Sequence, residues 1–585
     1  MLNYINISAK KAMSNFDQKK KQRQLLFAGL GATVLFLIIL TNFGSSSNDK
    51  FPDYKTDCGS FEAIPLLFNR SYDRILHDND YKLEVVKKLS EAIQIETVVY
   101  DSYGQPDLEK SLADDPEYSE FQKFHDYLEL TFPLVHKHLK KEIINKVGLL
   151  YTWEPLETSN FKPLLLMAHQ DVVPVEKSSI DKWTHPPFEG HYDHLSGKIY
   201  GRGSCDTKLF LIAQLSTVEL LLSEGYDIKK PLLLAYGFDE EIGGEYGAKF
   251  ISSLLADRFG ENGIEALFDE GPGVAQLDEA TFVASPGLAE MGYCDVYIEL
   301  ETLGGHSSAP NHWNIETTGI GIMSEVNYHM TEDQFEISVS PNNPVLSFMQ
   351  CSAKYNPESL DPTVLQSIKS NSLSKLTSAI KVTDDRFTFK TTLAMDVING
   401  GIKANAMPEL VKSVINHRID IQSSINETVN HDLKHIFNAA EKYDLGISVD
   451  WLNNGDKEVL RANTALGSFT VTVVGGLEPI ETIPYDDFYD LVASTCVSVY
   501  SDPIFASGHP NKKVDILFEG SMTPGNTDSV YYALQNLVNG RVYRFSGALM
   551  EWENEHTVDE WSTDRALMTS HAFLYSLIVN FNEQY

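Results

Sequence analysis

Four short apolar runs constrain the fold of this chain more than any other feature of its sequence. They occupy residues 147–153, 163–169, 231–238 and 264–269. Continuously apolar runs of this length are typical of strands that are buried on both faces. Helical patterns alternate with them, at residues 83–93, 208–225 and 245–260. This alternation predicts an α/β fold with a mostly parallel sheet flanked by helices, in which polar site residues gather at the carboxyl ends of the strands.

A different pattern begins near Gly287. Residues 293–303 alternate apolar and polar side chains, a Gly-Gly turn follows, and two more strand-like segments lie at residues 388–398 and 410–420. Alternation of this kind is typical of antiparallel strands with one buried face. We therefore expect an inserted α+β domain over residues 287–466, with helices on one face of its sheet. The α/β domain would then consist of two parts, residues 61–286 and 467–585.

The N-terminus carries an apolar segment that is long enough to cross a membrane. No charged residue occurs between Gln24 and Asn48, and residues 25–43 could span the roughly 30 Å of hydrocarbon as a helix. The preceding tail is rich in Lys and Arg, which favours its retention in the cytosol. We expect a cytosolic tail at residues 1–24, a transmembrane signal anchor at 25–44 and a stem at 45–60, with the rest of the chain in a lumen. The alternatives are a cleaved signal peptide and a buried helix of a soluble enzyme.

Charge and cysteine content exclude several classes of protein. The chain has 47 Lys and Arg against 82 Asp and Glu, a formal net charge of −35, so it would repel nucleic acid. A strongly acidic body suits an acidic organelle. The five scattered cysteines are too few for a disulfide scaffold or a cysteine-based zinc site, and their odd number leaves at least one thiol free. Asn69 and Asn426 lie in Asn-x-Ser/Thr sequons and are expected glycosylation sites if the body is luminal.

Imidazole and carboxylate side chains follow the expected strands in order along the chain. They are His169 and Asp171 in AHQDVVPV, Asp206 in GRGSCDTK, Glu240 and Glu241 in FDEEIGG, Asp269 and Glu270 in FDEG, and His556 in NEHTVDE. Each of these residues alone is more often structural or solvated. Together they are the ligand types of zinc or a similar divalent ion that keeps open coordination positions. The sequence therefore predicts a metal site at the carboxyl edge of the sheet.

The segments HQDVVPV, GRGSCDTK, DEEIGG, GGHSSAP and EHTVDEW resemble, in order and approximate spacing, the M20 family of zinc metallopeptidases. The similarity extends from about residue 60 to the C-terminus. This family includes aminoacylases, carnosinase-type dipeptidases and the carboxypeptidase S branch. The N-terminal anchor and the sequences LLLMAHQDVVPV and INGGIKANAMPE resemble that last branch, the Gly-X carboxypeptidases of fungal vacuoles. The resemblance implies a zinc-peptidase catalytic domain with an inserted lid domain.

The same resemblance implies a role for each candidate residue. It implies two Zn²⁺ per chain bridged by Asp206, with His169 and Asp269 on one ion and Glu241 and His556 on the other; Glu270 is the alternative to Asp269. Asp171 would fix the ring of the ligating histidine. Glu240 would be the general base for a metal-activated water.

Three further residues match lid positions of the family. His306 in GGHSSAP resembles a histidine that donates to the developing oxyanion, while Arg418 and Asn405 match residues that hold substrate. Structural roles, a turn for His306 and a salt bridge for Arg418, are the alternatives. The segment GNTDS resembles a substrate-contacting Gly-Gly-Thr-Asp turn, with Asn526 in place of the second glycine.

The sequence thus predicts a membrane-anchored dizinc carboxypeptidase that acts on short peptides with a free C-terminal carboxylate. Its expected location is the vacuole lumen or the vacuolar membrane, as a single-pass type II protein. One alternative is an N-acyl-amino-acid amidohydrolase, because the same site cleaves any amide presented to it. The other is a catalytically silent luminal homologue. No nucleic-acid partner is expected, and no oligomeric state follows from the sequence.

Overall fold

The computed structural model describes residues 49–51, 57–157, 160–309, 317–451, 453–505, 514–523 and 525–585. The chain forms two compact units, one of residues 1–53 and 361–382 and the other of the remaining residues. The expected transmembrane segment at residues 25–44 lies outside the described residues. Among the helices that the structure does describe, none is long and apolar enough to cross a bilayer.

The smaller unit contains a pair of short helices, α10 (Pro362–Lys369) and α11 (Leu373–Ile380). The side chain of Asp49 accepts hydrogen bonds from Ser372 Oγ at 2.8 Å and from the backbone N–H of Ser374 at 2.7 Å. The backbone N–H of Phe51 donates to Asn371 Oδ1 at 2.7 Å. The segment that follows the expected anchor is therefore hydrogen-bonded to the loop between these two helices.

The larger unit is built around an eight-stranded sheet with the order β1-β2-β6-β3-β7-β21-β10-β20. The strands are β1 (Lys140–Ile144), β2 (Gly148–Trp153), β3 (Leu164–His169), β6 (Leu232–Gly237), β7 (Ala266–Asp269), β10 (Gly287–Glu290), β20 (Ser521–Thr523) and β21 (Val542–Arg544). The four central strands β6, β3, β7 and β21 are parallel, as expected. Strands β1 and β2 at one side, and the β10–β21 pair at the other, are antiparallel, so the sheet as a whole is mixed.

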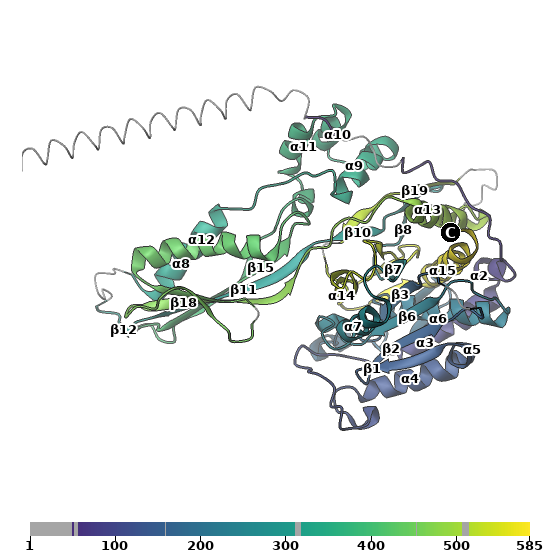
Figure 1. The fold of residues 1–585 in the computed structure, drawn as a ribbon, viewed down its shortest axis with the longest axis horizontal. Coiled ribbons are helices and arrows are strands. Elements are labelled where there is room, and N and C mark those ends of the chain that lie inside the picture. Colours follow the sequence, from purple (N-terminus) through teal and green to yellow (C-terminus); the bar gives the residue numbers. More distant parts are fainter. Residues whose placement is uncertain are drawn as a thin grey trace, which may run out of the picture. The chain divides into compact units, whose positions relative to one another are not determined.

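Helices cover both faces of this sheet, because successive side chains of each strand point to opposite sides. Leu164 and Leu166 of β3 pack into one core with α3 (Asn79–Ile93), α6 (Lys208–Ser223), α13 (Asp487–Tyr500) and α15 (Asp564–Gln584). Leu165 and Met167 pack on the other side, with α7 (Ala248–Phe259) and α14 (Ser529–Leu534) (Figure 1). Every residue of β2, β3 and β6 is buried, which explains their continuously apolar sequences.

Shorter elements complete this α/β body. They are the helices α2 (Tyr72–His77), α4 (Ser119–Thr131), α5 (Pro133–His138) and α9 (Pro344–Tyr355), a sheet of β4 (His191–Asp193), β5 (Lys198–Tyr200), β22 (Trp552–Glu553) and β23 (Trp561–Thr563), and a sheet of β8 (Val274–Gln276), β9 (Thr281–Ala284) and β19 (Asp515–Phe518). A disulfide joins Cys58 to Cys351 of α9, and this pair packs against Val283 of β9 and Leu517 of β19. Cys205, Cys294 and Cys496 are free.

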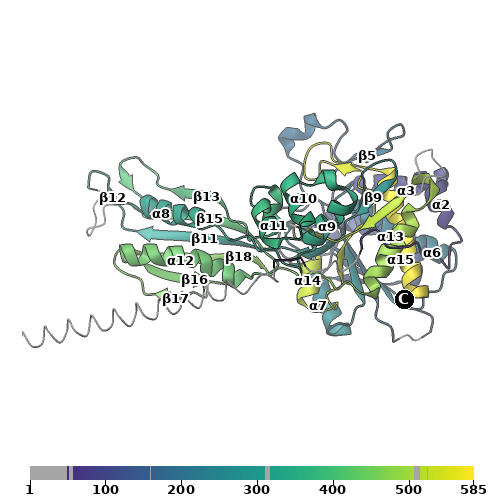
Figure 2. The ribbon, with the colours of Figure 1, turned by 90° about the horizontal axis from the view of Figure 1, so that it is seen from above.

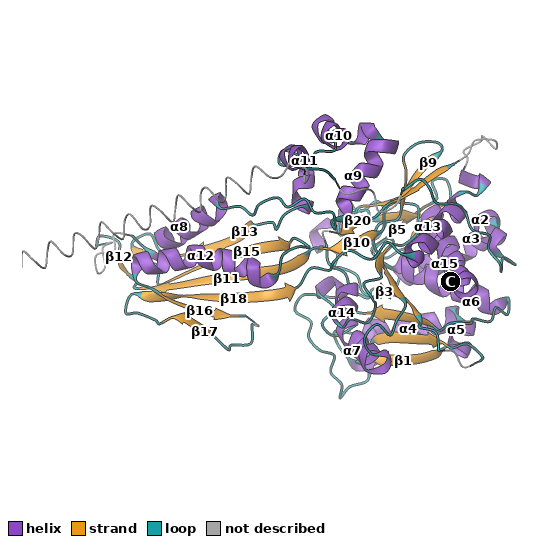
Figure 3. Cartoon of the chain, turned by 45° about the horizontal axis from the view of Figure 1, so that its top comes forward, coloured by secondary structure: helices purple, strands orange, loops and turns teal. Residues whose placement is uncertain are grey.

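The inserted segment forms a six-stranded sheet with the order β13-β15-β11-β18-β16-β17. Its strands are β11 (Gly292–Thr302), β13 (Ala394–Gly400), β15 (Leu410–Ile419), β16 (Gly446–Asp450), β17 (Glu458–Arg461) and β18 (Gly467–Leu477). Figures 2 and 3 show α8 (Gly319–Glu332) and α12 (Ile425–Tyr443) lying along one face of it, and their apolar residues share a core with the strands. A separate short pair consists of β12 (Gly305–His306) and β14 (Ala406–Met407).

Two details of this inserted sheet differ from the sequence-based expectation. Strand β18 pairs with β11 throughout its length although it begins at Gly467, one residue beyond the expected end of the insertion. Strand β16 runs parallel to β18, so the sheet is not purely antiparallel. The reason is that β17 intervenes between β16 and β18 in sequence and pairs at the outer edge, which lets β18 return alongside β16 in the same direction.

Candidate metal centre

Loops at the carboxyl edge of the large sheet hold most of the candidate ligands. His169 is the last residue of β3, Glu240 and Glu241 follow β6 in a short 3-10 turn, and Glu270 follows β7. Strands β3, β6 and β7 are neighbours and parallel, so their ends lie side by side. Asp206 comes from the loop that precedes α6, and the loop after β22 supplies the remaining histidine.

The carboxylate of Asp206 lies between two histidines. Its Oδ1 is 3.1 Å from His169 Nε2, and its Oδ2 is 2.9 Å from His556 Nε2. Glu270 Oε1 lies 3.4 Å from His169 Nε2, and Glu241 Oε2 lies 3.1 Å from His556 Nε2. The side chains therefore form two groups of donor atoms that share one carboxylate.

The structure brings Glu270, and not Asp269, to this cluster. Asp269 is 2% exposed, and its two oxygens accept the backbone N–H groups of Glu270 at 2.9 Å and Ser529 at 3.0 Å. Of the two residues that the sequence left open as a ligand, this geometry favours Glu270, and the ligand role of either residue stays a prediction. The side chain of Asp269 ties the end of β7 to the start of α14, and it presents Glu270 to the cluster.

Asp171 and Glu560 hold the surrounding loops in place. Asp171 is fully buried: its backbone O lies 3.0 Å from His169 Nδ1, and its Oδ2 accepts the backbone N–H of Glu241 at 3.0 Å. Glu560 is also fully buried, and it accepts the backbone N–H groups of Gly203 and Cys205 while it pairs with Arg202. Sequence reasoning missed Glu560, because the groups it holds lie more than 350 residues away in the chain.

Burial and mutual repulsion raise the pKa values of the carboxyl groups here. Burial raises the pKa of Glu270 to about 8, and burial with the nearby Asp206 raises the pKa of Glu241 to about 7. Burial and Glu270 raise the pKa of Glu240 well above its usual value. Hydrogen bonds to Asp206 and Glu241 raise the pKa of His556 to about 10. Protons thus compensate an excess of negative charge in this cluster.

This donor set fits divalent metal ions. Each of the two groups of donor atoms has one imidazole and one carboxylate of its own, and both groups share the carboxylate of Asp206. Ligand atoms of His169, Asp206 and Glu241 lie within 4.8 Å of one another. Two buried carboxylate oxygens, Asp171 Oδ1 and Glu241 Oε1, have no hydrogen-bond partner within the described part of the chain. A cation would satisfy the ligand oxygens and replace the shared protons.

The cluster opens into a cavity of about 450 Å³. Asp206, Glu240, Glu241, Glu270 and His556 line one part of it. Another part is apolar and includes Leu209, Phe210, Pro272, Ala548, Met550 and Trp552. Sequence reasoning did not single out these apolar residues, since they lie in three separate segments and follow no motif.

The expected lid residues are divided between two places. Arg418, on β15, donates from Nη1 to Asn526 Oδ1 at 2.9 Å, and Asn526 lines the cavity. His306 and Asn405 lie together at the β12–β14 strand pair, where the Asn405 carbonyl accepts the backbone N–H of Ser307 at 3.2 Å. Neither His306 nor Asn405 is among the described residues that line the cavity. Arg418 does not line the cavity either, but it is hydrogen-bonded to a residue that does, whereas the described residues include no such partner for His306 or Asn405.

The two sequon asparagines are both exposed. Asn69 precedes α2, and Asn426 is the second residue of α12. The threonine of the second sequon, Thr428, is fully buried in the same helix. Glycosylation of either asparagine remains a prediction.

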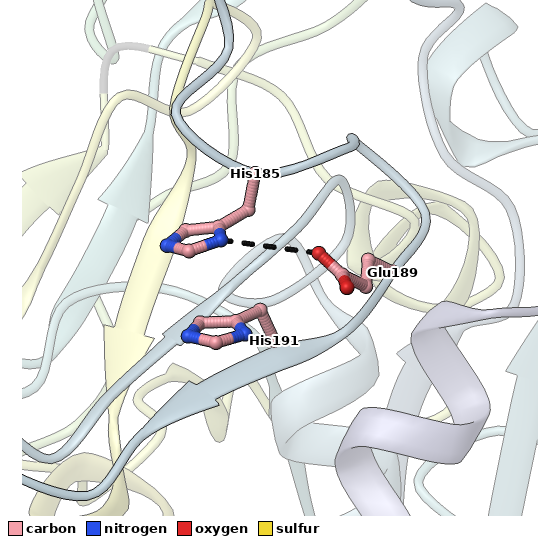
Figure 4. Close-up of side chains that lie close together, drawn as sticks. All are labelled: His185, Glu189 and His191. Atoms are coloured by element: carbon pink, nitrogen blue, oxygen red, sulfur yellow. Dashed lines mark ion pairs between the residues drawn. The ribbon is translucent and has the colours of Figure 1, made fainter.

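A further group of candidate metal ligands lies at His185, Glu189 and His191 (Figure 4). The two imidazole rings are stacked, with centroids 3.7 Å apart and planes 9° from parallel, and His185 Nδ1 lies 3.8 Å from Glu189 Oε2. In-plane lone pairs of parallel rings point side by side and do not converge on one ion. This arrangement is a stacked pair with an acidic neighbour.

Comparison with known proteins identifies the family. The sequence signature of peptidase family M20/M25/M40 matches residues 165–580, which include all of the candidate ligands. The chain belongs to this peptidase family. It is therefore a member of an enzyme family, and the resemblance of its motifs is confirmed.

The alignments with several related proteins cover almost the whole chain. Carboxypeptidase S of Saccharomyces cerevisiae is 37% identical over 545 residues, which cover 91% of this chain and 90% of that protein. The N-fatty-acyl-amino acid synthase/hydrolase of Mus musculus is 27% identical over 578 residues, with 94% and 95% covered. The solved structure of the di-peptidase Dug1p of Saccharomyces cerevisiae matches with a TM-score of 0.55 at 14% identity, covering 88% of this chain and 98% of that one. At that identity the match shows a shared fold alone.

Proposed function

We propose that this chain is a membrane-anchored carboxypeptidase that uses two Zn²⁺ ions to remove the C-terminal residue of short peptides. The observation that carries the proposal is the position of Asp206, whose two oxygens each face a different histidine. Membership of a peptidase family and 37% identity to a relative named carboxypeptidase S support the reaction class.

The metal ligands in this proposal follow the two donor groups of the cluster. His169 and Glu270 would hold one ion, His556 and Glu241 the other, and Asp206 both. Bound there, zinc would supply a water activated at neutral pH and a polarised scissile carbonyl. Asp171 keeps the ring of His169 oriented, and the other residues of the site bind the peptide and move protons.

Glu240 is the proposed general base. Its carboxylate lines the cavity next to Glu241 and Glu270, and burial raises its pKa well above the usual value. A carboxylate with a raised pKa can take a proton from the attacking water and later give it to the amine nitrogen of the leaving residue. Water is consumed, the peptide bond breaks, and a free amino acid leaves.

Arg418 is the proposed partner of the substrate carboxylate. Its guanidinium donates to Asn526, which lines the cavity, and an arginine suits a carboxylate because it can donate two parallel hydrogen bonds. His306 and Asn405 remain proposed contacts to the oxyanion and the substrate. These two roles require the β12–β14 strand pair to approach a cavity that its described residues do not line.

The proposed location is the lumen of the vacuole, with a single N-terminal span at residues 25–44 and a cytosolic tail. The disulfide between Cys58 and Cys351 supports a luminal body, because structural disulfides persist in oxidising compartments and are rare in the cytosol. Residues 61–286 and 467–585 would then form the catalytic domain, and the insertion between them would form the lid, including β18.

Hydrolysis of N-acyl-amino acids is the second candidate. The apolar part of the cavity, with Phe210, Met550 and Trp552, lies next to the metal cluster and could hold an acyl chain. A relative with 27% identity is named for reactions of N-fatty-acyl-amino acids. A carboxypeptidase and an acylase would share the metals and Glu240 and differ in what occupies this apolar part.

One assay decides between the two candidates. The purified full-length chain is given zinc and either a blocked Gly-Leu dipeptide or an N-acyl-leucine, and the release of leucine is measured with and without chelator. Chelator-sensitive release from the dipeptide supports the carboxypeptidase. Strong release of leucine from the acyl-leucine, with no release from the dipeptide, would support the acylase instead. If zinc-loaded protein released leucine from neither substrate, both proposed functions would be refuted.

A further inference from the structure

A second group of imidazole and carboxylate side chains lies on the helical face of the inserted sheet. His431 and His435 are four residues apart on α12, so they point from the same face of the helix. Asp333 directly follows the last residue of α8. Its Oδ2 lies 3.0 Å from His435 Nε2 and 3.6 Å from His431 Nε2. Ligand atoms of all three residues lie within 4.8 Å of one another.

The ring of His431 is held from its other side in the manner of a metal ligand. Its Nδ1 lies 3.4 Å from Asp432 Oδ1, and the other oxygen of Asp432 lies 2.9 Å from His417 Nε2. Phe335 packs against the same ring, with centroids 4.2 Å apart. A carboxylate on one ring nitrogen fixes the tautomer and leaves a lone pair on the other nitrogen, here Nε2, which faces Asp333.

The two imidazoles of this group are oriented differently from the stacked pair at His185 and His191. The ring planes of His431 and His435 are 63° apart, with centroids separated by 5.5 Å. In-plane lone pairs of rings at such an angle can converge on one point, whereas those of the parallel pair in Figure 4 cannot. The two groups contain the same kinds of ligand, and only the group on α12 has suitable geometry.

Lys434 is the competing partner of the carboxylate. Its Nζ lies 2.7 Å from Asp333 Oδ2, and the two side chains are 61% and 42% exposed. An ion pair this exposed contributes little to stability, because water solvates both groups well. A divalent ion held by two imidazoles can therefore displace the ammonium group, which returns to water.

We propose that Asp333, His431 and His435 form a zinc site that links the end of α8 to the middle of α12. Two imidazoles and one carboxylate are a common zinc ligand set, and water would complete a tetrahedral shell. The ion would cross-link two helices that also meet through the apolar core of the insertion and through the ion pair of Glu325 with Lys442. This site is separate from the centre at Asp206 and does not depend on the proposed peptidase reaction.

The test compares the zinc content and thermal unfolding of four full-length proteins after dialysis against dilute Zn²⁺. They are the wild type, Asp333→Asn, His435→Gln and the control His329→Gln, which removes an exposed histidine of α8 outside the group. We expect Asp333→Asn and His435→Gln to hold about one zinc per chain less than the wild type. We also expect zinc to raise the unfolding temperature of these two variants less than that of the wild type. The control should behave as the wild type in both measurements.

Asp333→Asn preserves the shape of a half-exposed side chain, so it keeps the test valid if His435→Gln folds poorly. Lys434→Gln should bind zinc more tightly than the wild type, since it removes the competitor. Equal zinc content in the wild type and Asp333→Asn would overturn the proposal. A fall in amide hydrolysis that parallels the loss of zinc would also overturn it, because the missing ion would then belong to the centre at Asp206.

Discussion

Arg418 donates a hydrogen bond from Nη1 to Oδ1 of Asn526 over 2.9 Å. The amide nitrogen of Asn526 donates in turn to Glu290 Oε1 at 2.7 Å and to the carbonyl of Met291 at 2.9 Å. Glu290 is fully buried and forms an ion pair with Arg544. Asn526 thus connects Arg418 to the point where β10 leads into the inserted sheet. Glycine, which the family turn has at this position, has no side chain to make these contacts.

Asn526→Gly should weaken substrate binding more than turnover. A hydrogen bond to a charged group contributes about 1.5–3 kcal/mol, so loss of the Arg418 contact should raise KM by roughly 10- to 100-fold with little change in kcat. Steady-state kinetics on a short peptide measure this split. Asn536→Gly is the control, because Asn536 already has a positive φ of 52° that glycine adopts freely. A fall in kcat at constant KM would contradict the role.

Glu240→Gln should abolish turnover and leave the metals in place. Loss of a general base typically lowers kcat by about 10² to 10⁴. Zinc content should stay at the wild-type value, because Glu240 is not one of the proposed ligands. The exposed Glu245, changed to Gln, is the matched control from the same loop. If the Glu240 variant kept wild-type kcat, another residue would have to be the base.

Glu270→Gln and Asp269→Asn should fail in different ways. The Glu270 variant should lose zinc affinity, because its carboxylate is 3.4 Å from His169 Nε2. The Asp269 variant should keep zinc and lose about 1.5–3 kcal/mol of stability, because Asn can replace only one of two charge-assisted acceptors. Metal analysis and urea unfolding of both variants test this. Zinc lost from the Asp269 variant alone would restore Asp269 as the ligand.

The metal-free protein should become less stable as the pH rises. The pKa values of Glu241 and Glu270 are raised from 4.5 to about 7 and about 8, so the folded chain holds protons that the unfolded chain releases. That contribution is complete at low pH and is lost as the pH rises through about 8. Zinc displaces the same protons, so its affinity should increase over this range. Unfolding measurements at about pH 5 and pH 8, with and without zinc, test both the fall in stability of the metal-free protein and the rise in stabilisation by zinc. A stabilisation by zinc that is the same at both pH values would contradict the prediction.

The apolar runs of the large sheet allowed most of it to be predicted. Each run from residue 147 to residue 269 contains a strand of the structure, and the parallel core and the flanking helices follow from their alternation. The antiparallel direction of β2 could not be predicted from the sequence, since a strand buried on both faces is continuously apolar in either direction. The end of the insertion could not be predicted either, because the apolar and polar side chains of β18 alternate in the same way as those of the preceding strands.

The composition of the site was predictable, and its geometry was only partly so. Motifs identified His169, Asp206, Glu241 and His556, which the structure brings together. Whether Asp269 or Glu270 faces the cluster depends on where β7 ends, because side chains alternate between the two faces only within the strand. The buried acid Glu560 acts through backbone N–H groups of a distant loop, and no local pattern indicates that contact.

The disulfide determines which single proteolytic cuts would leave the chain in one covalent piece. Cys58 is bonded to Cys351, so a cut at one point between these two residues would leave both fragments covalently joined. A cut between Phe51 and Cys58 lies outside this cross-linked loop, and the described contacts of the N-terminal piece include the hydrogen bonds of Asp49 with residues 372 and 374. Such bonds contribute about 1 kcal/mol each and exchange readily with water. A cut on the N-terminal side of Cys58 would therefore separate that piece from a body that keeps its covalent cross-link and all of its candidate metal ligands.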